Sequence, residues 1–573
     1  MNVRIYLKRA CSKRKSFNAI AFFSSTCRNL EAVEKAYYVT TPIFYVNDAP
    51  HIGHLHSMVV ADIIKRWQVL KGRQAFLCTG TDEHGMKVQH AAKVAKKNPQ
   101  DYCDSMAETY KLLAERANIS NDHFVRTTDP SHKDAVQHFW TVLRDKNLIY
   151  ESKHEGWYCI SDETFYPEGK IEKRLDPFTG RAYMASQETG KEVEWTSERN
   201  YHFKLSELRE PLLKFYEENP EFVLPKERMD EVVSSVRSGL EDLSISRPAD
   251  RSRWGIQVPC DESQVIYVWL DALINYISKA KYPWPPGQQS MAGWPADVHV
   301  IGKDIVRFHC IYWPAFLLAA GIKPPKQILS HAHWTLGKKK MSKSTGNVVN
   351  PFFAIDRFGV DTIRYYLALE GGILNDSDYG NINIVTRYKR GLQGGLGNLL
   401  FRLSRPLVWN VRLCIKDHEK RRSSKDSFSE TENLRILLQQ LPDTVSFHMD
   451  QLNVGKALYC IMKAVHQTNT YFQDTAPWKL TQSFVTLKQL ENRSDSVKPL
   501  AEIIYHCAES LRIVGILLQP FMPGKSADLL DMLCVYTHRR SFTFAKLGAD
   551  FDFGNKTTSQ KNQMLFPMLP VEK

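Results

Sequence analysis

An apolar segment that gives way to a helix at a His-x-Gly-His motif constrains the fold of this chain more than any other feature. Residues 37–46 are rich in aromatic and β-branched side chains, which predicts a β-strand. Beyond residues 47–50 the apolar side chains recur with helical spacing, so His51-Ile52-Gly53-His54 lies at a helix N-terminus. The unpaired backbone N–H groups and the helix dipole favour an anion there, and Gly53 lets a ligand approach the backbone closely. The segment therefore predicts a phosphate site in a nucleotide-binding α/β fold.

A second motif, Lys340-Met341-Ser342-Lys343-Ser344, lies in a polar stretch at residues 337–347. A loop of this composition can close over a triphosphate, and its lysines can pair with phosphate oxygens. Either motif alone has a plain structural explanation, a helix start or a solvated turn, but together and in this order they predict ATP chemistry. His51 and His54 are the candidates to donate hydrogen bonds to charge that develops in a transition state. The other expected ATP contacts are Gly53, Lys340, Ser342 and Lys343.

The first thirty residues differ from the rest in composition. They hold seven Lys or Arg, no Asp or Glu and several serines, and they carry about half of the chain's net charge of +13. That composition is typical of a mitochondrial transit peptide, so we expect residues 1–30 to direct the chain to the mitochondrial matrix. A basic tail that touches RNA is the alternative. The remaining charge suits a polyanionic partner but does not by itself demonstrate RNA binding.

Cysteine usage and hydropathy exclude two other classes of protein. The eleven cysteines are scattered and include no CxxC pair, which indicates reduced thiols rather than a disulfide framework. The longest apolar stretch, around residues 310–320, is shorter than the ~20 residues of a membrane span, so no membrane partner is expected.

Length and the alternation of strand-like and helical segments predict several domains. Strands are expected at residues 37–46, 75–79, 265–270 and 298–301, and helices at 56–70, 101–116, 272–280 and from Asp304 onward. The expected domains are the two halves of the α/β fold at 37–150 and 263–330, a Gly-, Pro- and charge-rich insertion at 151–262, a region with the lysine motif at 331–385, and a helical domain at 386–573. Within the helical domain we expect a loop at 416–433, and the glycines at 394–397 are expected to open a helix.

The two motifs resemble the signatures of the class I aminoacyl-tRNA synthetases, HIGH and KMSKS. Further segments are similar to the methionyl-tRNA synthetases of that class: residues 40–47, 79–85, 267–272 with Tyr276, 301–305 with Phe308 and His309, Asn398 with Arg402, and 476–478. This resemblance, over roughly residues 37–525, implies a Rossmann-like α/β class I synthetase catalytic domain with a connective insertion, followed by an all-α anticodon-binding helix bundle. It also implies a ligase that activates L-methionine with ATP and transfers it to tRNA(Met) for mitochondrial translation.

Methionine requires an apolar, aromatic pocket with one or two hydrogen-bond donors near its weakly accepting sulfur. The resemblance assigns this pocket to Ile43, Tyr45, Asp82, Trp269, Ala272, Leu273, Tyr276, Ile305 and His309. Asp82 is expected to hold the α-amino group, and Tyr276 and His309 to contact the thioether. Judged without the resemblance, Trp269 and Tyr276 are equally well explained as ordinary core aromatics.

The resemblance also implies how the nucleotide is held. Asp304 is expected to bind the adenylate ribose or the substrate, and Lys340 and Lys343 the pyrophosphate. Mg²⁺ should accompany ATP, held largely by phosphate oxygens and water. A structural zinc needs four ligands, usually Cys or His. The insertion keeps Cys159 but has Asp162 where a second cysteine would stand, so no zinc is expected.

Three residues of the helical domain are candidates to read the anticodon. Asn398 and Arg402 lie four residues apart, hence on one face of a helix, and supply donors and an acceptor. Trp478 offers a stacking platform for an unpaired base, with a buried bundle tryptophan as the alternative. No oligonucleotide-binding barrel follows the helical domain, and a monomer is expected.

Three other functions fit part of the pattern. The length, the helical C-terminal half and Trp478 argue against a small-molecule adenylyltransferase. The intact His51, His54, Lys340 and Lys343 argue against a non-catalytic tRNA-binding protein. A class I synthetase for cysteine would need a zinc ligand set, and the insertion is too short for the editing domain of the isoleucine, valine and leucine enzymes.

Overall fold

The computed structural model describes residues 35–159, 164–176, 179–285, 287–290, 292–341, 347–404, 409–421, 429–480, 494–554 and 564–569. The expected transit peptide at residues 1–30 lies outside the described residues, as do Asp162, Ser342, Lys343 and the side chain of Lys340.

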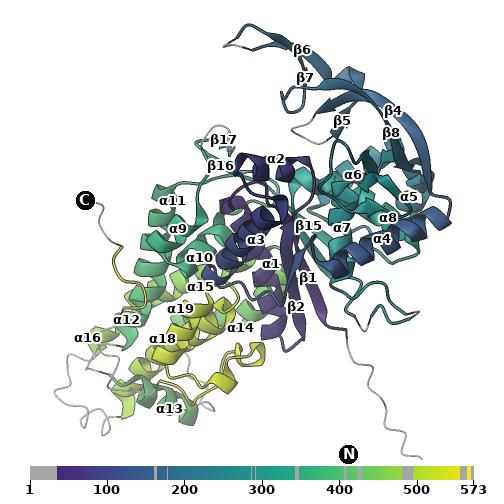
Figure 1. Cartoon of the computed structure of the whole chain (residues 1–573). Coiled ribbons are helices and arrows are strands. Elements are labelled where there is room, and N and C mark those ends of the chain that lie inside the picture. Colours follow the sequence, from purple (N-terminus) through teal and green to yellow (C-terminus); the bar gives the residue numbers. More distant parts are fainter. Residues whose placement is uncertain are drawn as a thin grey trace, which may run out of the picture. The chain divides into compact units, whose positions relative to one another are not determined.

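A parallel six-stranded sheet is the centre of the α/β part (Figure 1). Its order is β3 (His123–Arg126), β2 (Ala75–Asp82), β1 (Tyr37–Tyr45), β14 (Val298–Gly302), β15 (Gln327–His331), β9 (Val223–Leu224). The chain moves outward from β1 to β3 and later resumes on the other side of β1 at β14, so the strand order reverses between β1 and β14. Ligands in such sheets bind beyond the carboxyl ends of the strands at that point. The predicted strands at residues 37–46, 75–79 and 298–301 are confirmed, and so is the predicted α/β organisation of this part of the chain.

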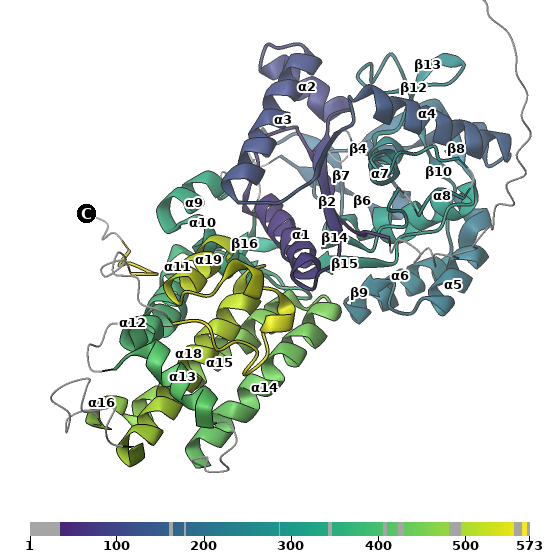
Figure 2. The same cartoon turned by 90° about the horizontal axis from the view of Figure 1, so that it is seen from below.

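Successive side chains of each strand point to opposite faces of the sheet, and both faces are covered by apolar clusters. Val39, Val300 and Leu329 belong to the apolar cluster on one face, with α1 (Ile52–Leu70) and α3 (Pro99–Arg116). Their neighbours Tyr38, Ile301 and Ile328 belong to the cluster on the other face, with α4 (Pro130–Asp145), α7 (Val268–Ser278) and α8 (Trp313–Ala320). Figure 2 shows α1 and α7 on opposite sides of β2 and β14. A connecting helix, α2 (Met86–Val94), lies between β2 and α3.

The insertion is built on two long antiparallel strands, β4 (Ile149–Cys159) and β8 (Glu194–Phe203), flanked by β5 (Thr164–Tyr166) and β10 (Leu243–Ser244). A hairpin of β6 (Ile171–Leu175) and β7 (Ala182–Ser186) lies at its far end (Figure 1). The remaining elements are α5 (Arg209–Glu218), α6 (Lys226–Ser238), β11 (Ser246–Pro248), β12 (Gln257–Val258) and β13 (Asp261–Ile266). The insertion also supplies β9, which pairs with β15 as the edge strand of the main sheet; the sequence patterns did not predict this.

Two predictions around the second half of the α/β fold are wrong in their boundaries. The strand expected at 265–270 ends at Ile266, and the helix expected from residue 272 begins at Val268. Aromatic and β-branched residues favour a strand locally, but packing against the sheet decides the outcome. Trp269 is therefore in the first turn of α7. The helix expected from Asp304 is instead a short 3₁₀ turn at Lys303–Ile305 and a π-helical turn at Phe308–Tyr312, followed by α8.

The C-terminal part is helical, as predicted. A small sheet of β16 (Trp334–Leu336), β17 (Lys339–Lys340) and β18 (Ser377–Asp378) precedes it, with α9 (Pro351–Phe358) and α10 (Val360–Glu370). The bundle contains α11 (Asn381–Arg387), α12 (Asn398–Ser404), α13 (Val411–Arg421), α14 (Ser429–Asp450), α15 (Val454–Thr475), α16 (Pro477–Leu480), α18 (Ser494–Leu518) and α19 (Pro523–Met532). The apolar face expected on the last long helix is confirmed, since Leu500, Ile504 and Leu511 of α18 are all buried.

Two expectations about the bundle need correction. The loop expected at 416–433 is helical at both described ends, because α13 continues to Arg421 and α14 begins at Ser429. Polar residues there were mistaken for a loop, although a solvated helix face is equally polar. The glycines at 394–397 do not open a helix; they lie in a π-helical segment, Tyr388–Gly397, that runs directly from α11 into α12.

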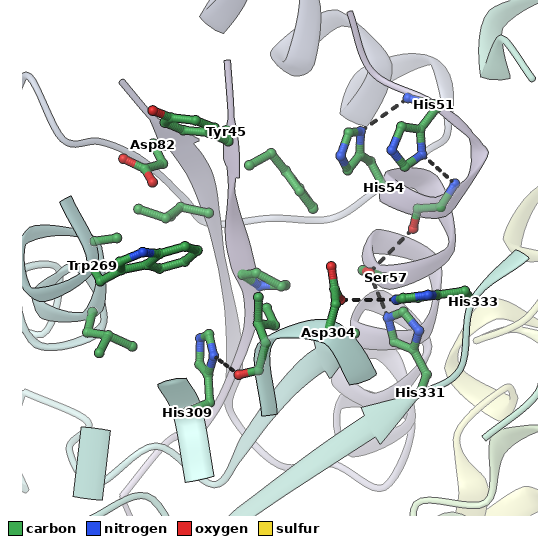
Figure 3. Close-up of a pocket in the computed structure, with 18 of the residues that line it drawn as sticks. Tyr45, His51, His54, Ser57, Asp82, Trp269, Asp304, His309, His331 and His333 are labelled. Carbon is green, nitrogen blue, oxygen red and sulfur yellow. Dashed lines mark hydrogen bonds and ion pairs between the residues drawn. The ribbon is translucent and has the colours of Figure 1, made fainter. Parts of the chain in front are cut away.

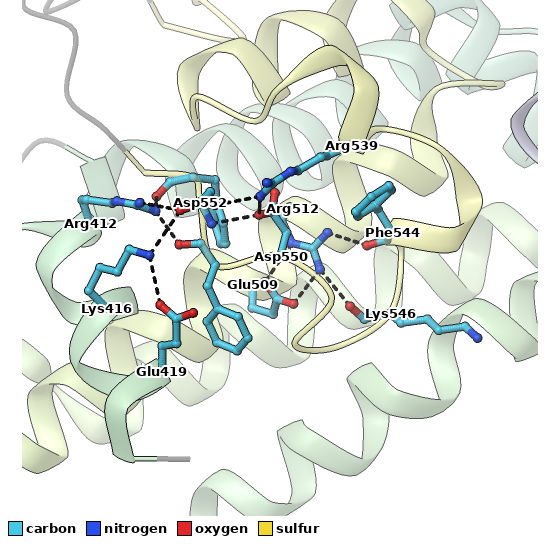
Figure 4. A network of polar contacts seen from close by, with 12 residues as sticks. Arg412, Lys416, Glu419, Glu509, Arg512, Arg539, Phe544, Lys546, Asp550 and Asp552 are labelled. Atoms are coloured by element: carbon cyan, nitrogen blue, oxygen red, sulfur yellow. Dashed lines mark hydrogen bonds and ion pairs between the residues drawn. The ribbon is translucent and has the colours of Figure 1, made fainter.

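A network of charges holds the C-terminal segment against α13 and α18 (Figure 4). Asp552 accepts hydrogen bonds from Arg412 at 2.8 Å and from Lys416 and Arg539 at 3.2 Å each. These donors hold the pKa of Asp552 well below its usual range. Beneath them the fully buried pair Glu509–Arg512 joins α18 to the same segment, because Arg512 also donates to the carbonyl oxygens of Phe544 and Lys546.

A buried histidine, His506 of α18, makes the bundle sensitive to acid. Burial lowers the pKa of His506 to about 4, against an ordinary value of 6.5. Between these values the unfolded chain binds the extra proton, so the stability that neutral His506 contributes is full above pH 6.5 and is lost as pH falls toward 4. We expect the free energy of unfolding of wild type, measured relative to that of His506→Gln, to fall by about 2 kcal/mol between pH 7 and pH 5. Urea denaturation at both values measures this.

The matched control is His538→Gln, because His538 is an exposed histidine of the same C-terminal region. Its unfolding free energy should change with pH in parallel with wild type. A pH dependence for His506→Gln identical to that of wild type would contradict the assignment.

Candidate active site

A cavity of about 350 Å³ lies at the carboxyl ends of β1, β2, β14 and β15, where the strand order reverses (Figure 3). Thirteen predicted site residues line it: Ile43, Tyr45, His51, Gly53, His54, Asp82, Trp269, Ala272, Leu273, Tyr276, Asp304, Ile305 and His309. Five further lining residues lie inside the segments singled out from the sequence but were not named as site residues: Pro42, Phe44, Val268, Gly302 and Met341. The lining residues that the sequence patterns missed are Ser57, Lys87, His331, Ala332, His333 and Trp334. Segments from both halves of the α/β fold thus meet at one cavity.

The two histidines of the first motif form the N-terminal cap of α1. The backbone N–H of Gly53 donates to Nδ1 of His51, and the backbone N–H of His51 donates to Nδ1 of His54, each at 3.1 Å. The rings stack with centroids 3.7 Å apart. Because a backbone N–H can only donate, both Nδ1 atoms accept, and each neutral ring carries its proton on Nε2. The cap therefore fixes both rings as hydrogen-bond donors through Nε2, the form that an oxyanion requires.

The opposite end of the cavity is apolar and aromatic. Trp269 stacks on Phe308 with ring centroids 3.8 Å apart, and Ala272, Leu273 and Ile305 lie beside it. This end therefore has the low polarity that suits an apolar side chain.

Tyr276 and His309 form a buried polar pair at that apolar end. His309 Nδ1 lies 3.0 Å from the carbonyl oxygen of Ile305, which fixes the ring proton on Nδ1. Nε2 then accepts the hydroxyl proton of Tyr276 at 2.7 Å. Burial lowers the pKa of His309 to about 4, so the ring is neutral at physiological pH. A ligand beside this pair meets the oxygen of Tyr276 rather than its proton.

Asp82 is the carboxylate between the two ends. It is the last residue of β2. The residue is 6% exposed, and its side chain faces the cavity near Tyr45 and Trp269 (Figure 3). The carboxyl ends of β1 and β2 run side by side, with Tyr45 paired to Asp82. A buried carboxylate in an apolar surround is a strong site for a cationic group.

A second buried carboxylate, Asp271, fastens α7 to the end of β2. It accepts hydrogen bonds from His84 at 2.6 Å and from His132 at 2.7 Å. Burial alone would raise its pKa, but the two imidazoles outweigh that effect and hold the pKa of Asp271 at about 2. His84 follows Asp82 by two residues, and Asp271 follows Trp269 by two. The hydrogen bond between His84 and Asp271 therefore fixes the position of Asp82 relative to Trp269 in the cavity wall.

Histidines at the end of β15 complete the nucleotide end of the cavity. Ser57 lies 2.7 Å from Nε2 of His331, whose Nδ1 donates to the carbonyl oxygen of Ala332. His333 Nε2 lies 3.1 Å from the carboxylate of Asp304. The sequence holds a signal for these histidines, since His331-Ala332-His333 follows a short apolar run that could form a strand. The carboxyl ends of parallel strands lie at one edge of a sheet, so residues after such a run are candidates for the site.

The candidate anticodon residues lie in the bundle. The Arg402 guanidinium is 5.2 Å from the ring centre of Trp478 and 4.8 Å from that of Phe472, and it donates to Gln473 at 2.9 Å. Asn398 is exposed one turn earlier on α12, and Trp478 is half-buried. Arg402 and Trp478 are thus brought together, with Asn398 on the same helix as Arg402.

Two further features of the described residues concern metal ligands and membrane-spanning helices. Cys159 is buried at the end of β4. Within the described ranges, no cluster of three His, Cys, Asp or Glu side chains is arranged to hold a metal ion. Among those same residues, no helix combines the length and apolarity needed to cross a membrane.

Comparisons with known proteins agree with this geometry. The family profile described as "tRNA synthetases class I (M)" matches residues 37–404. A probable mitochondrial methionine–tRNA ligase of Neurospora crassa is 52% identical over 93% of this chain and 85% of its own length. The mitochondrial methionine–tRNA ligase of Homo sapiens is 40% identical over 94% of this chain and 91% of its own. The Mycobacterium tuberculosis methionyl-tRNA synthetase in complex with methionyl-adenylate superimposes with a TM-score of 0.82 at 35% identity, over 93% of this chain and all of that one.

Fold, cavity and family profile together define a class I aminoacyl-tRNA synthetase. Within that class the chain belongs to the methionyl-tRNA synthetases, the methionine–tRNA ligases, which use ATP.

Proposed function

We propose that the cavity carries out both steps of methionine transfer. The methionine carboxylate attacks the α-phosphate of ATP, giving methionyl-adenylate and pyrophosphate, and the terminal ribose of tRNA(Met) then attacks the adenylate. No protein nucleophile is needed, so the residues act by positioning and by stabilising charge. One observation carries this proposal: an aromatic pocket, a buried carboxylate and a helix N-terminus with two imidazole donors share one cavity.

For the amino acid, we assign the side chain to the apolar end. Ile43, Tyr45, Trp269, Ala272, Leu273, Tyr276, Ile305 and His309 would enclose it. Asp82 would pair with the α-ammonium group. Because a hydrophobic pocket separates neighbours that differ by one methylene by only ~1–3 kcal/mol, rejection of leucine and isoleucine depends on shape and on the Tyr276–His309 pair beside the sulfur.

For ATP, we assign the phosphates to the N-terminus of α1. His51 and His54 would donate to the α-phosphate as its charge develops, with Gly53 allowing close approach. Lys340, Ser342 and Lys343 would hold the pyrophosphate. Asp304, at the nucleotide end of the cavity beside His333, would hold the ribose or substrate. Mg²⁺ would be held mainly by phosphate oxygens and water, and would supply further neutralising charge.

For tRNA(Met), we assign anticodon reading to Asn398, Arg402 and Trp478. Residues 37–150 and 263–330 would form the catalytic domain around a connective insertion at 151–262 that holds no zinc. Residues 331–385 would contact the stem, and residues 386–573 would form the anticodon-binding domain. We further propose a monomer in the mitochondrial matrix, with residues 1–30 as its transit peptide; the basic, acid-free composition of that segment supports this.

Methionine-dependent ATP–pyrophosphate exchange tests the proposal. We expect the protein that lacks residues 1–30 to exchange label with methionine and not with leucine, isoleucine or cysteine at equal concentration. Exchange with cysteine instead would favour a cysteine enzyme. Folded protein without exchange for any amino acid would overturn the proposal in favour of a non-catalytic tRNA-binding protein.

A further inference from the structure

One arginine joins the helix that carries the phosphate motif to the helical bundle. Arg364 lies on α10, and its side chain is 1% exposed. Its guanidinium donates to the Asp62 carboxylate at 2.6 Å, to the carbonyl oxygens of Pro520 at 2.9 Å and Phe521 at 3.1 Å, and to that of Ala117 at 3.2 Å. One planar group therefore bonds three separate segments of the chain.

On the catalytic side, Asp62 receives the arginine. Asp62 is fully buried on α1, eight residues after His54, which is about 12 Å along the same helix. Its other oxygen accepts from the backbone and hydroxyl of Ser120 at 2.7 and 2.6 Å. Burial would raise the pKa of Asp62, but Arg364, Arg66 and Ser120 outweigh burial and lower it, so the group stays ionised. Asp62 is thus a fixed anchor in the helix whose N-terminus faces the cavity.

On the bundle side, α10 holds the corner between α18 and α19. Arg364 engages the carbonyls of Pro520 and Phe521, and Asp361 of the same helix accepts the backbone N–H of Lys525 in the first turn of α19. The helix that ends at this corner, α18, packs against α12, α15 and α16. Two of those helices, α12 and α16, carry Arg402 and Trp478, which are assigned above to the anticodon, and α15 carries Phe472 beside the Arg402 guanidinium.

We propose that Arg364 is a positioning residue for the tRNA-dependent step. It would fix the bundle on α1 so that a tRNA held at the bundle presents its 3′ end to the cavity. This rests on the proposed function, in which the bundle binds the anticodon. Adenylate formation needs only the cavity, whereas transfer needs two distant parts of one RNA to be engaged at once. A loosened junction should therefore affect the second step and leave the first intact.

Lysine cannot replace arginine in this role. The guanidinium offers five N–H donors in a rigid plane, and here they reach a carboxylate and several carbonyl oxygens in different directions. A lysine ammonium keeps the charge opposite Asp62 but has three donors on a flexible stem, so at least part of the contact to the α18–α19 corner is lost. Arg364→Lys thus separates the geometry of the junction from its charge.

The experiment compares three activities of the full chain carrying Arg364→Lys: pyrophosphate exchange, charging of full-length tRNA(Met), and charging of an RNA hairpin that has only the acceptor stem and 3′ end. We expect kcat/KM for the full tRNA to fall about tenfold to a hundredfold, with exchange and hairpin charging within about twofold of wild type. Asp361→Asn loosens the same corner and leaves the Arg364–Asp62 contact in place. It should lower kcat/KM for the full tRNA by a smaller factor, again with exchange and hairpin charging retained. This variant replaces Arg364→Lys if Arg364→Lys fails to fold.

Two controls separate the possible causes. Asp552→Asn breaks the C-terminal network, whose residues make none of the hydrogen bonds of this junction, so it reports the effect of lost bundle stability alone. Parallel losses of exchange and of tRNA charging in Arg364→Lys would overturn the proposal, as would a loss no larger than that of Asp552→Asn. Trp478→Ala tests the underlying assignment: wild-type charging by that variant would refute anticodon reading by Trp478, whatever Arg364→Lys does.

Discussion

Replacing His54 with alanine should lower kcat for methionine-dependent pyrophosphate exchange about 10²–10³-fold, with little change in the KM for methionine. The reason is the backbone cap, which commits Nδ1 of His54 to accepting a hydrogen bond and so leaves Nε2 as a fixed donor. Losing one preorganised donor to a developing oxyanion costs about 3–4 kcal/mol of transition-state stabilisation. Steady-state exchange kinetics over a range of ATP and methionine concentrations measure both parameters.

Tyr110→Phe is the matched control. The Tyr110 hydroxyl lies 3.4 Å from the same Nδ1 atom, and its loss leaves the Nε2 donor in place. We expect less than about a tenfold change in kcat for this variant. If His54→Ala retained exchange at the level of Tyr110→Phe, His54 would be a helix cap and not a phosphate ligand.

Replacing Asp82 with asparagine should weaken methionine binding by about 2–4 kcal/mol, which is roughly 30- to 1,000-fold in Kd. Asp82 is 6% exposed at the end of β2, so its pairing with an ammonium group takes place largely out of water. Asparagine keeps the size of the side chain and removes its charge. Quenching of tryptophan fluorescence, with Trp269 in the cavity wall, offers a direct readout of binding.

The deaminated analogue γ-methylthiobutyrate completes a two-by-two comparison. It lacks the ammonium group, so it should bind wild type and Asp82→Asn with nearly equal affinity. An equal loss of affinity for methionine and for the analogue would mean that Asp82 maintains the shape of the cavity and makes no ion pair with the substrate.

The sequence predicted the cavity best where imidazole or carboxylate side chains follow a predicted strand. Asp82 was predictable because it ends a strand within a motif, and His51 and His54 because their motif begins the helix that follows a strand. Parallel strand ends share one edge of a sheet, which brings these segments together. Trp269 was placed in the cavity but on the wrong element, since local residue preference favoured a strand and packing produced a helix. The motif around Trp269 thus predicted the lining of the cavity better than it predicted the local secondary structure.

Other residues could not be found from one sequence because their partners are remote. Asp271 meets His84 and His132 across more than a hundred residues, and nothing near Asp271 in the chain marks it as an anchor. Arg364 is similar, with its carboxylate partner 302 residues earlier. Long-range pairing of this kind has no local period or spacing, and only the folded arrangement reveals it.

The position of β14 beside β1 has a consequence for how the chain reaches its native state. Tyr38 and Asp297, which are hydrogen-bonded where these strands begin, are 259 residues apart. A chain emerging from its N-terminus can pair β1, β2 and β3, but one side of β1 stays an open edge until the whole insertion has been made. Such long-range pairing slows folding and leaves an exposed edge that invites association. We therefore expect refolding from denaturant to be slow and its yield to fall as protein concentration rises, with the first half of the sheet formed before the second.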